Sequence, residues 1–369
     1  MKILQISSAS SFGGGERHLV DLTNSLIDRG HDLYAVMRPQ SPLLSHLRIP
    51  AGNIKTLPLR NALDAQSARE LARFVKEHQI EIVHAHMARD YSLAAYATHR
   101  NSRTKFIVTR HVMFPLNRFH RRTLAQVGRI IAVSSAVAGQ LRSQRLVSED
   151  RITVVPNGVD VFRFAKARAE FSRYQFIQSK NLPVDCLLVG SIGELRTLKR
   201  HDDFIRAAAV VVRTAPQSHF IIAGVDTSAS GEVLKQLETL ARQLGIEDRV
   251  HFLGWLDNAE ALLCAVDVFV SASQTESFGL SIAEAMATGT AVVATRTEGA
   301  QEVIDDQRTG LLVPIGDIDR LAESIATLLA DENKRDLLGS QAREAVNERF
   351  SLNRMVDEIE KIYRERLGS

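Results

Sequence analysis

Apolar, strand-like runs alternate with helical patterns along this chain, and the whole alternation begins twice. The first series opens with the apolar run 1–8 and an amphipathic pattern at 18–29, which Gly30 closes. The second series opens with the apolar run 187–190 and a helical pattern at 202–212. Strands that alternate with helices form a parallel sheet covered by helices. The sequence therefore predicts an α/β protein with two Rossmann-like domains.

The 369 residues are a suitable length for two such domains. We predict a first domain over 1–165, a polar, strandless linker over 166–180, and a second domain over 181–350. A final amphipathic segment, 351–369, is expected to be a helix that packs back across the domain junction. Because open α/β sheets bind ligands at the carboxyl ends of their strands, a site is expected in a central cleft between the two sheets.

Composition excludes several classes of protein. Hydrophobic residues make up 45% of the chain and charged residues 24%, as in ordinary globular proteins. No run is long enough to cross a membrane, and a strand-like run follows Lys2 directly, so we expect no signal peptide and a cytoplasmic location. Cys186 and Cys264 lie in apolar runs and are expected to be buried free thiols.

The charge is divided unevenly between the two halves of the chain. Residues 1–165 contain 23 Lys and Arg against 12 Asp and Glu, whereas residues 166–369 contain 23 against 31, so the halves carry +11 and −8. The first half is therefore expected to meet an anionic partner. No nucleic-acid motif is present, which favours an anionic membrane surface or an acidic acceptor. The segment 114–122 mixes apolar and basic residues and suits a membrane or a lipid-linked acceptor.

The segment 276–284 places two carboxylates, Glu276 and Glu284, eight positions apart around the turn formed by Phe278, Gly279 and Leu280. A helical pattern begins just after the turn. The unpaired N–H groups of a first helical turn and the helix dipole attract anions. Two carboxylates beside such a site can accept hydrogen bonds from hydroxyl groups. The pattern therefore suits a ligand with phosphates and many hydroxyls, such as a nucleotide sugar.

A second charged segment follows the first strand of the second domain. It contains Arg196, Lys199 and Arg200, three cations within five residues at a strand end, which suits a diphosphate. A solvated basic loop, with Asp202 and Asp203 capping the next helix, remains an alternative.

The first domain has a glycine turn, 13–15, between its first strand and helix. It is not a G-x-G-x-x-G dinucleotide motif, because position 18 is His, and the second strand ends in Arg38 rather than an acid. These two departures argue against a nicotinamide-dependent dehydrogenase.

Histidines follow two strands of this domain. His111 comes after one strand and is placed to contact a sugar hydroxyl or transfer a proton. His84 and His86 end another strand, where they could line an acceptor site or form a metal-binding pair. The sequence gives no signal for a third ligand nearby, so no metal is predicted.

Taken together, these motifs resemble the retaining glycosyltransferases of family 4. The matching segments are 13–18, 155–160, 276–284, 295–302 and 309–314, and the resemblance covers nearly the whole length. It implies the GT-B fold, in which two Rossmann-like domains with parallel sheets face a central cleft. One departure is that Gly190 is followed by Ser191, where many members have Gly-Arg.

The resemblance also implies roles for individual residues. On the first domain, Gly14 and Gly15 would approach the donor diphosphate, and His111 would contact the donor sugar near the reacting carbon. On the second domain, the implied roles are diphosphate binding by Arg196 and by Lys199 or Arg200, sugar-hydroxyl binding by Glu276, backbone N–H contacts from Phe278, Gly279 and Leu280, ribose binding by Glu284, and base binding near Trp255.

The implied activity is transfer of a hexose-type sugar from a nucleoside-diphosphate sugar to an acceptor hydroxyl, with retention of anomeric configuration. The expected setting is cell-envelope polysaccharide, lipopolysaccharide or glycolipid synthesis, at the cytoplasmic face of the plasma membrane. A UDP donor is expected and a GDP donor is the alternative. No cofactor and no metal are expected. A sugar-nucleotide epimerase and a non-catalytic nucleotide-sugar-binding protein remain open.

Overall fold

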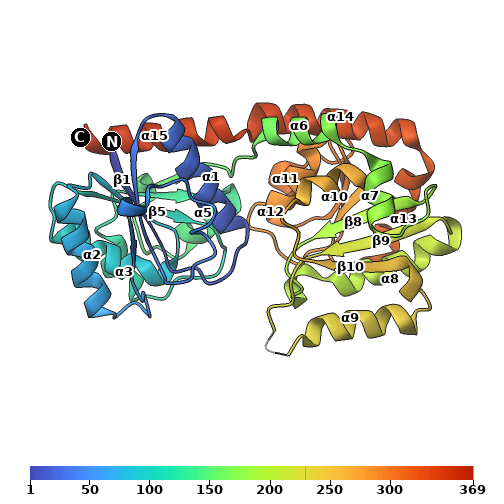
Figure 1. Ribbon diagram of the computed structural model, residues 1–369, viewed down its shortest axis with the longest axis horizontal. Helices are drawn as coiled ribbons and strands as arrows, with labels where there is room; N and C mark the ends of the chain where they lie inside the picture. Colours follow the sequence, from blue (N-terminus) through green and yellow to red (C-terminus); the bar gives the residue numbers. More distant parts are fainter. Residues whose placement is uncertain (229, 369) are drawn as a thin grey trace. The chain divides into compact units, whose positions relative to one another are not determined.

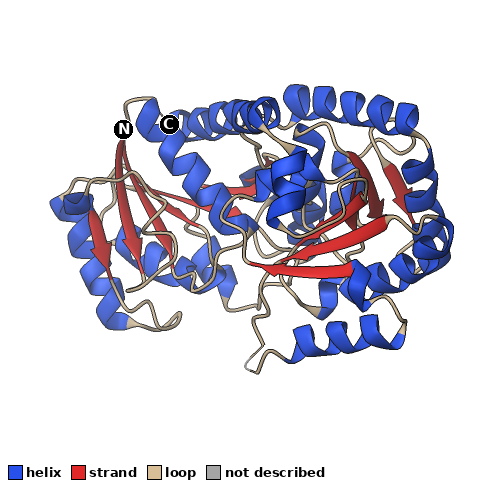
Figure 2. Cartoon of the chain, turned by 45° about the vertical axis from the view of Figure 1, so that its right-hand side comes forward, coloured by secondary structure: helices blue, strands red, loops and turns tan. Residues whose placement is uncertain are grey.

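The computed structural model describes residues 1–228 and 230–368, and this part of the chain forms two compact units (Figure 1). Unit 1 comprises residues 1–158 together with the helix Leu352–Leu367, and unit 2 comprises residues 159–351. Each unit is built on a parallel sheet flanked by helices (Figure 2). Two parallel α/β domains are thus confirmed. Within the described residues, no helix combines the length and apolar character needed to traverse a bilayer.

Unit 1 contains, over its described residues, a seven-stranded sheet in the order β3-β2-β1-β4-β5-β6-β7, with all neighbouring strands parallel. The strands are β1 (Lys2–Ser7), β2 (Asp32–Met37), β3 (Ile54–Thr56), β4 (Ile82–Ala85), β5 (Lys105–Arg110), β6 (Arg129–Ala132) and β7 (Ile152–Val154). The strand order reverses between β1 and β4. The carboxyl ends of these strands therefore mark the switch point where such sheets bind ligands.

The α-helices described in unit 1 are α1 (Gly14–Asp28), α2 (Ala65–Glu77), α3 (Tyr91–His99), α4 (His120–Leu124), α5 (Ser135–Ser143) and α15 (Leu352–Leu367). Helix α1 begins at the glycine turn, where the Glu16 carboxylate accepts a hydrogen bond from the backbone N–H of Gly13 at 3.1 Å. Leu19, Leu22 and Leu26 recur at helical spacing and are buried, so they fix this helix on the sheet.

Helix α15 lies in the core of unit 1, although unit 2 separates it from the rest of that unit in sequence. Its buried residues are Met355, Val356, Ile359, Ile362 and Tyr363. The Tyr363 hydroxyl forms a hydrogen bond with His84 Nδ1 on β4 at 2.6 Å, and Arg29 at the end of α1 pairs with Glu360 at 2.9 Å. The helix predicted at the end of the sequence is therefore part of the first domain.

Unit 2 contains, over its described residues, a six-stranded parallel sheet in the order β10-β9-β8-β11-β12-β13. The strands are β8 (Leu187–Ile192), β9 (Ser218–Ala223), β10 (Val250–Gly254), β11 (Val268–Ser271), β12 (Ala291–Thr295) and β13 (Leu311–Val313). The order reverses between β8 and β11, so the carboxyl ends of these strands form the switch point of this sheet.

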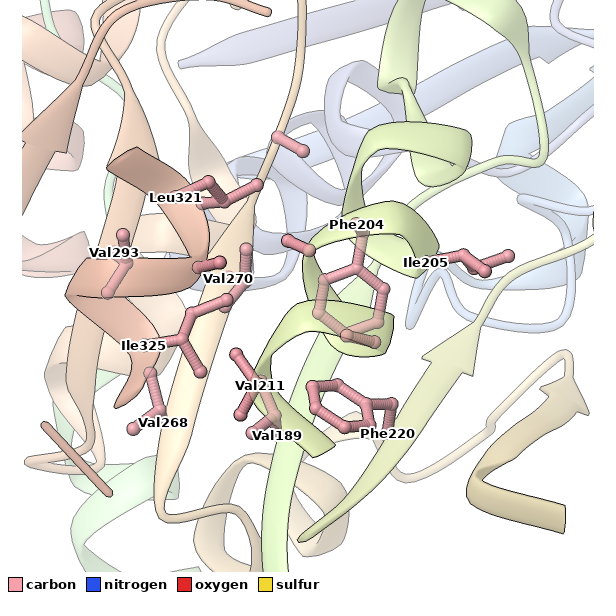
Figure 3. Close-up of a cluster of buried hydrophobic side chains, with 14 of the residues drawn as sticks. Val189, Phe204, Ile205, Val211, Phe220, Val268, Val270, Val293, Leu321 and Ile325 are labelled. Atoms are coloured by element: carbon pink, nitrogen blue, oxygen red, sulfur yellow. The ribbon is translucent and has the colours of Figure 1, made fainter. Parts of the chain in front are cut away.

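The α-helices described in unit 2 are α6 (Val161–Glu170), α7 (Arg173–Ser179), α8 (His201–Thr214), α9 (Glu232–Gln243), α10 (Ala259–Ala265), α11 (Leu280–Ala287), α12 (Glu298–Val303), α13 (Ile318–Ala330) and α14 (Glu332–Arg349). The core of unit 2 joins helices α8 and α13 to the sheet (Figure 3). Phe204 on α8 packs edge-to-face on Phe220 of β9, with ring centroids 5.7 Å apart. Leu321 and Ile325 of α13 belong to the same buried cluster.

The predicted linker over 166–180 is wrong, because the chain passes from unit 1 to unit 2 at residues 158–159. Helices α6 and α7 occupy the predicted linker and pack on α10 within unit 2. Arg163 pairs with Glu260 at 2.8 Å, and Arg173 pairs with Asp267 at 2.7 Å. The segment has few apolar residues because cations fix much of it to unit 2, and such contacts leave no apolar periodicity in the sequence.

Candidate functional site

At the carboxyl edge of the unit 2 sheet, the loops after β8, β9 and β10 lie in backbone contact. The N–H of Gly193 donates to the carbonyl of Ala223 at 2.9 Å, and the N–H of Gly224 donates to the carbonyl of Gly254 at 2.8 Å. Gly224 has φ +155°, and a Cβ there would lie 1.8 Å from the carbonyl oxygen of Gly193. Glycine at this position therefore lets the β8 loop, which leads to the predicted diphosphate-binding cations, close against its neighbour.

The three predicted cations have different partners. Arg196 pairs with Glu194 at 3.0 Å, Lys199 pairs with Glu276 at 2.6 Å, and Arg200 pairs with Asp203 in the first turn of α8 at 2.5 Å. Arg200 adopts a left-handed backbone conformation, with φ 48°, as the residue that precedes α8. The structure thus joins Lys199 to the predicted sugar-binding acid, whereas Arg200 is engaged with its own helix.

Glu276 is held in place from several sides. Its Oε1 accepts from Lys199 Nζ and from the Ser273 hydroxyl, both at 2.6 Å, and its side chain is only 11% exposed. Its backbone carbonyl accepts from the N–H of Gly299 at 3.1 Å. A cation and a hydroxyl therefore orient this carboxylate, and a backbone amide fixes the main chain that carries it. This arrangement suits a group that must meet ligand hydroxyls in a fixed geometry.

The turn after Glu276 leads directly into helix α11. Gly279 has φ 92°, and the first hydrogen bond of the helix runs from the N–H of Ala283 to the Gly279 carbonyl at 3.0 Å. The N–H groups of Leu280 and the next two residues therefore have no acceptor inside the helix, as predicted for an anion site. Phe278 is buried and packs on Phe350, with ring centroids 5.4 Å apart, which anchors the turn. Glu284 lies one turn into α11 and is partly exposed.

Trp255 follows β10 at the same edge of the sheet. It is 46% exposed, and its Nε1–H donates to the Asp257 carboxylate at 2.9 Å. An exposed indole on this edge offers an aromatic surface for a ring of a ligand.

Gly299 is a site residue that motif reading did not single out, although it lies within the matching segment 295–302. A Cβ at this position would lie 2.5 Å from the Glu276 carbonyl oxygen and 2.7 Å from the Phe278 nitrogen. Helix α12 therefore packs directly on the backbone of the acidic turn, and glycine alone permits that approach.

We expect Gly299→Ala to lower the melting temperature of unit 2 by several degrees. Alanine stabilises a helix interior by about 1 kcal/mol relative to glycine. We expect the clash of the new Cβ to exceed this gain and to lower the free energy of unfolding by a net amount of about 1–3 kcal/mol. Differential scanning calorimetry measures the change. Gly139→Ala in α5, where a Cβ meets open space, is the matched control. An unchanged or raised melting temperature in Gly299→Ala would show that the turn has room to move.

In unit 1, the glycine turn and His111 lie together at the switch point. Gly14 begins α1 and is exposed, and a Cβ on Gly15 would lie 3.2 Å from Cγ of His111. The predicted pair of a glycine turn and a strand-end histidine is therefore one contiguous surface. The backbone of the glycine turn comes close to the His111 imidazole because Gly15 has no side chain.

His111 belongs to a buried cluster with His18 of α1 and His86 after β4. The ring centroids of His18 and His111 lie 4.8 Å apart, and His86 Nδ1 lies 3.2 Å from His111 Nε2. Asn157 Oδ1 and Gln5 Oε1 lie within 2.9 and 2.8 Å of His18 Nδ1 and His86 Nε2. Since an amide oxygen only accepts, these two nitrogens carry the protons. His86 Nδ1 then accepts from His111 Nε2–H.

These tautomers leave lone pairs on His18 Nε2 and His111 Nδ1, which are buried atoms without a hydrogen-bond partner among the described residues. Burial lowers the pKa of His18 to about 4, against a smaller opposing effect of the Asn157 hydrogen bond. Burial, with the nearby histidines adding to it, likewise holds the pKa values of His86 and His111 well below the usual range. The imidazoles of this cluster are therefore neutral near pH 7, and two of them retain a buried nitrogen that can accept a hydrogen bond.

The same three imidazoles could also hold a metal ion. One ring nitrogen from each of His18, His86 and His111 lies within 4.8 Å of the others, which makes them a candidate metal-binding group among the described residues. Imidazole nitrogen suits zinc and similar divalent ions. No sequence motif points to this third histidine, because His18 lies on a helix far from the other two histidines in the chain. His84 is not a member of this group, although its ring centroid lies 4.3 Å from that of His86, because both of its ring nitrogens are hydrogen-bonded, to Tyr363 and to Thr109.

The comparisons with known proteins define the class. Residues 12–163 match the model described as Glycosyltransferase Family 4, and residues 172–345 match the model described as Glycosyl transferases group 1. The chain is a glycosyltransferase of the GT-B fold, built from these two domains.

Individual relatives agree with this class. The chain is 28% identical to an N-acetyl-alpha-D-glucosaminyl L-malate synthase of Bacillus anthracis, over 97% of this chain and 95% of that protein. It is 29% identical to the lipopolysaccharide core biosynthesis glycosyltransferase LpsE of Rhizobium meliloti, over 94% of both. Its fold matches the crystal structure of Anabaena HepE in complex with UDP and glucose, with a TM-score of 0.86, 23% identity, and coverage of 99% of this chain and 100% of that one.

Proposed function

We propose that this glycosyltransferase transfers a hexose from a nucleoside-diphosphate sugar to an acceptor hydroxyl, with retention of anomeric configuration. The observation that carries the proposal is the group formed by Lys199, Glu276 and the amino end of α11 at one edge of the unit 2 sheet. A cation and free N–H groups suit a diphosphate, and an oriented carboxylate suits sugar hydroxyls. Glu284, farther along α11, would accept hydrogen bonds from the ribose hydroxyls.

In the proposed reaction, the bond between the anomeric carbon and the diphosphate oxygen breaks, and a bond from the acceptor oxygen forms on the same face of the sugar. The acceptor proton passes to the departing phosphate. Lys199, Arg196 and the N–H groups at the start of α11 would stabilise the negative charge that grows on the leaving group. Trp255 would stack on the base. In unit 1, Gly14, Gly15 and His111 would offer a surface for a phosphate or a sugar hydroxyl.

We propose UDP as the nucleotide, with GDP as the alternative, and an acceptor in cell-envelope synthesis at the cytoplasmic face of the plasma membrane. The UDP complex of Anabaena HepE and the lipopolysaccharide role in the name of LpsE support these choices. We further propose that the reaction needs no metal, since Lys199 and the helix terminus can neutralise the diphosphate. The histidine cluster would then act through hydrogen bonds alone.

Nucleoside diphosphate release from a panel of UDP-, GDP- and ADP-sugars, in the presence of EDTA, tests this function. We expect slow release from one nucleotide class, faster with acceptor. Loss of activity in EDTA, restored by zinc, would contradict the metal-free reaction. Binding without turnover would favour a non-catalytic nucleotide-sugar-binding protein, and interconversion of sugars on the nucleotide would favour an epimerase.

Glu284→Ala is expected to weaken nucleoside diphosphate binding by about 10–100-fold, because hydrogen bonds to a charged group contribute about 1.5–3 kcal/mol each. Isothermal titration calorimetry measures this change. Glu323→Ala, which removes an exposed acid from α13, is the matched control and should bind normally. Equal affinities for the two variants would remove Glu284 from the nucleotide site.

A further inference from the structure

A long segment of unit 1 contains no acidic residue. Residues 91–148 include nine arginines and one lysine, and no aspartate or glutamate. This segment runs from α3 through β5, α4 and β6 to the loop after α5. The positive charge of the first half of the sequence is therefore concentrated where no carboxylate of the same segment can neutralise it.

Three of these arginines line one pocket of about 350 Å³. Arg121 comes from α4, Arg142 from α5 and Arg145 from the loop after α5, and residues 146–149 complete the lining. All three arginines are exposed, and among the described residues none of them is paired with a carboxylate. Glu149 is the one acid in the lining. Guanidinium groups around a pocket of this size suit a phosphate, which they can bind with several parallel hydrogen bonds.

Two aromatic side chains lie exposed on the loop that leads to Arg121. Phe119 is 89% exposed and Phe114 is 55% exposed. The loop between them is fixed to the pocket wall, because the side-chain amide of Gln144, next to Arg145, exchanges two hydrogen bonds with the backbone of Leu116 at 3.2 and 3.3 Å. Arg110 also donates to the backbone carbonyl of Phe114. These part-buried hydrogen bonds hold the backbone that carries the exposed rings close to α5, which contributes Arg142 to the pocket.

We propose that this surface, residues 114–122 with 142–148, docks on a membrane that contains anionic phospholipids. A lipid phosphate would enter the pocket of Arg121, Arg142 and Arg145, and the two phenylalanines would enter the interfacial layer. Basic side chains near an anionic leaflet, combined with apolar side chains that insert, are what binds a protein reversibly to a membrane surface. The proposal goes beyond the sugar transfer proposed above and does not depend on it.

Sedimentation of the whole protein with vesicles tests this proposal. We compare vesicles of phosphatidylcholine alone with vesicles that contain 30% phosphatidylglycerol, for the unmodified chain, for Arg121→Ala/Arg142→Ala/Arg145→Ala and for Phe114→Ser/Phe119→Ser. The control, Arg60→Ala/Arg69→Ala/Lys76→Ala, removes the same charge from exposed positions elsewhere in unit 1. Since basic residues near an anionic surface each add to membrane affinity, the pocket variant should lose at least about tenfold in partitioning, and the control much less.

The proposal would be overturned if the protein bound anionic and neutral vesicles equally well. It would also be overturned if the control variant and the pocket variant lost the same amount of vesicle binding. Titrations with inorganic phosphate and with a single-stranded RNA form two further arms. If the protein does not bind vesicles but binds phosphate or RNA saturably, and this binding requires the three arginines, the pocket is a site for a soluble phosphate or for RNA instead. Circular dichroism checks that the variants are folded, and donor turnover without vesicles reports separately on the proposed reaction.

Discussion

Lys199→Ala is expected to lower kcat/KM for sugar transfer by about 10²–10³-fold, whereas Arg200→Ala should cost less than about tenfold. Removing one donor that stabilises growing negative charge typically has an effect of the larger size. The two residues are adjacent in sequence, but Lys199 Nζ lies 2.6 Å from Glu276 and Arg200 Nε lies 2.5 Å from Asp203 of its own helix. The structure therefore distinguishes two cations that the sequence leaves equivalent.

Initial rates of nucleoside diphosphate release at saturating acceptor measure this difference. Melting temperatures of both variants serve as the control, since a change in rate without a change in stability reports on the site. If Arg200→Ala costs as much as Lys199→Ala, the diphosphate draws Arg200 away from Asp203, and the pairing described here does not persist with the donor bound.

Acidification from pH 7 to pH 5 is expected to destabilise both units, and unit 1 more than unit 2. Burial lowers the pKa of His18 to about 4 and holds those of His84, His86 and His111 well below the usual range, and all four belong to unit 1. In the unfolded chain these imidazoles bind protons near pH 6.5, so the unfolded state gains protons first and stability falls as the pH falls. In unit 2, burial lowers the pKa values of His201 and His219 to about 4 and also lowers that of His251, so this unit loses stability on acidification through fewer histidines.

For a pKa of about 4 in the folded state, the loss between pH 7 and pH 5 is about 2 kcal/mol per histidine. Asp90 has the opposite effect. Burial raises its pKa to about 6, so the folded state binds a proton before the unfolded state does, which adds about 1 kcal/mol to the stability between pH 7 and pH 5. The balance for unit 1 is still a loss of several kcal/mol, which is comparable with the whole stability of a domain.

Calorimetry at pH 7, 6 and 5 should show one transition moving to lower temperature faster than the other. His18→Gln cannot titrate but keeps an amide donor for Asn157, so its stability should depend less on pH, by about 2 kcal/mol. His99→Gln, at an exposed position of α3, is the control. Parallel pH curves for the unmodified chain and His18→Gln would contradict a buried, neutral His18.

The two-domain α/β fold could be predicted from the sequence because strands buried on both faces give long apolar runs, which are easy to recognise. The strands β3 and β13 have only three residues each, too few to give a pattern. Helices α6 and α7 lie where the sequence predicts a linker, since arginine contacts rather than an apolar face attach much of them to unit 2. Local periodicity does not contain that information.

Residues within one motif were predicted together and are found together. Glu276, Gly279 and Glu284 are close in sequence, and the turn and helix between them follow from the glycine and the apolar spacing. Contacts between distant segments were missed. Gly299 approaches the acidic turn from the next helix, and His18 joins His86 and His111 from α1. Only the three-dimensional packing brings these residues together.

The place of α15 in unit 1 has a consequence for the order of folding during synthesis. Residues 159–351 contain all the strands described for the second sheet and are complete once residue 351 has left the ribosome. The first sheet, made earlier, still lacks the helix that packs on α1 and bonds to His84. The first domain to be translated is therefore expected to be the second to reach its native state. A nascent chain halted at residue 351 should resist protease over 159–351 and be cut readily within residues 1–158.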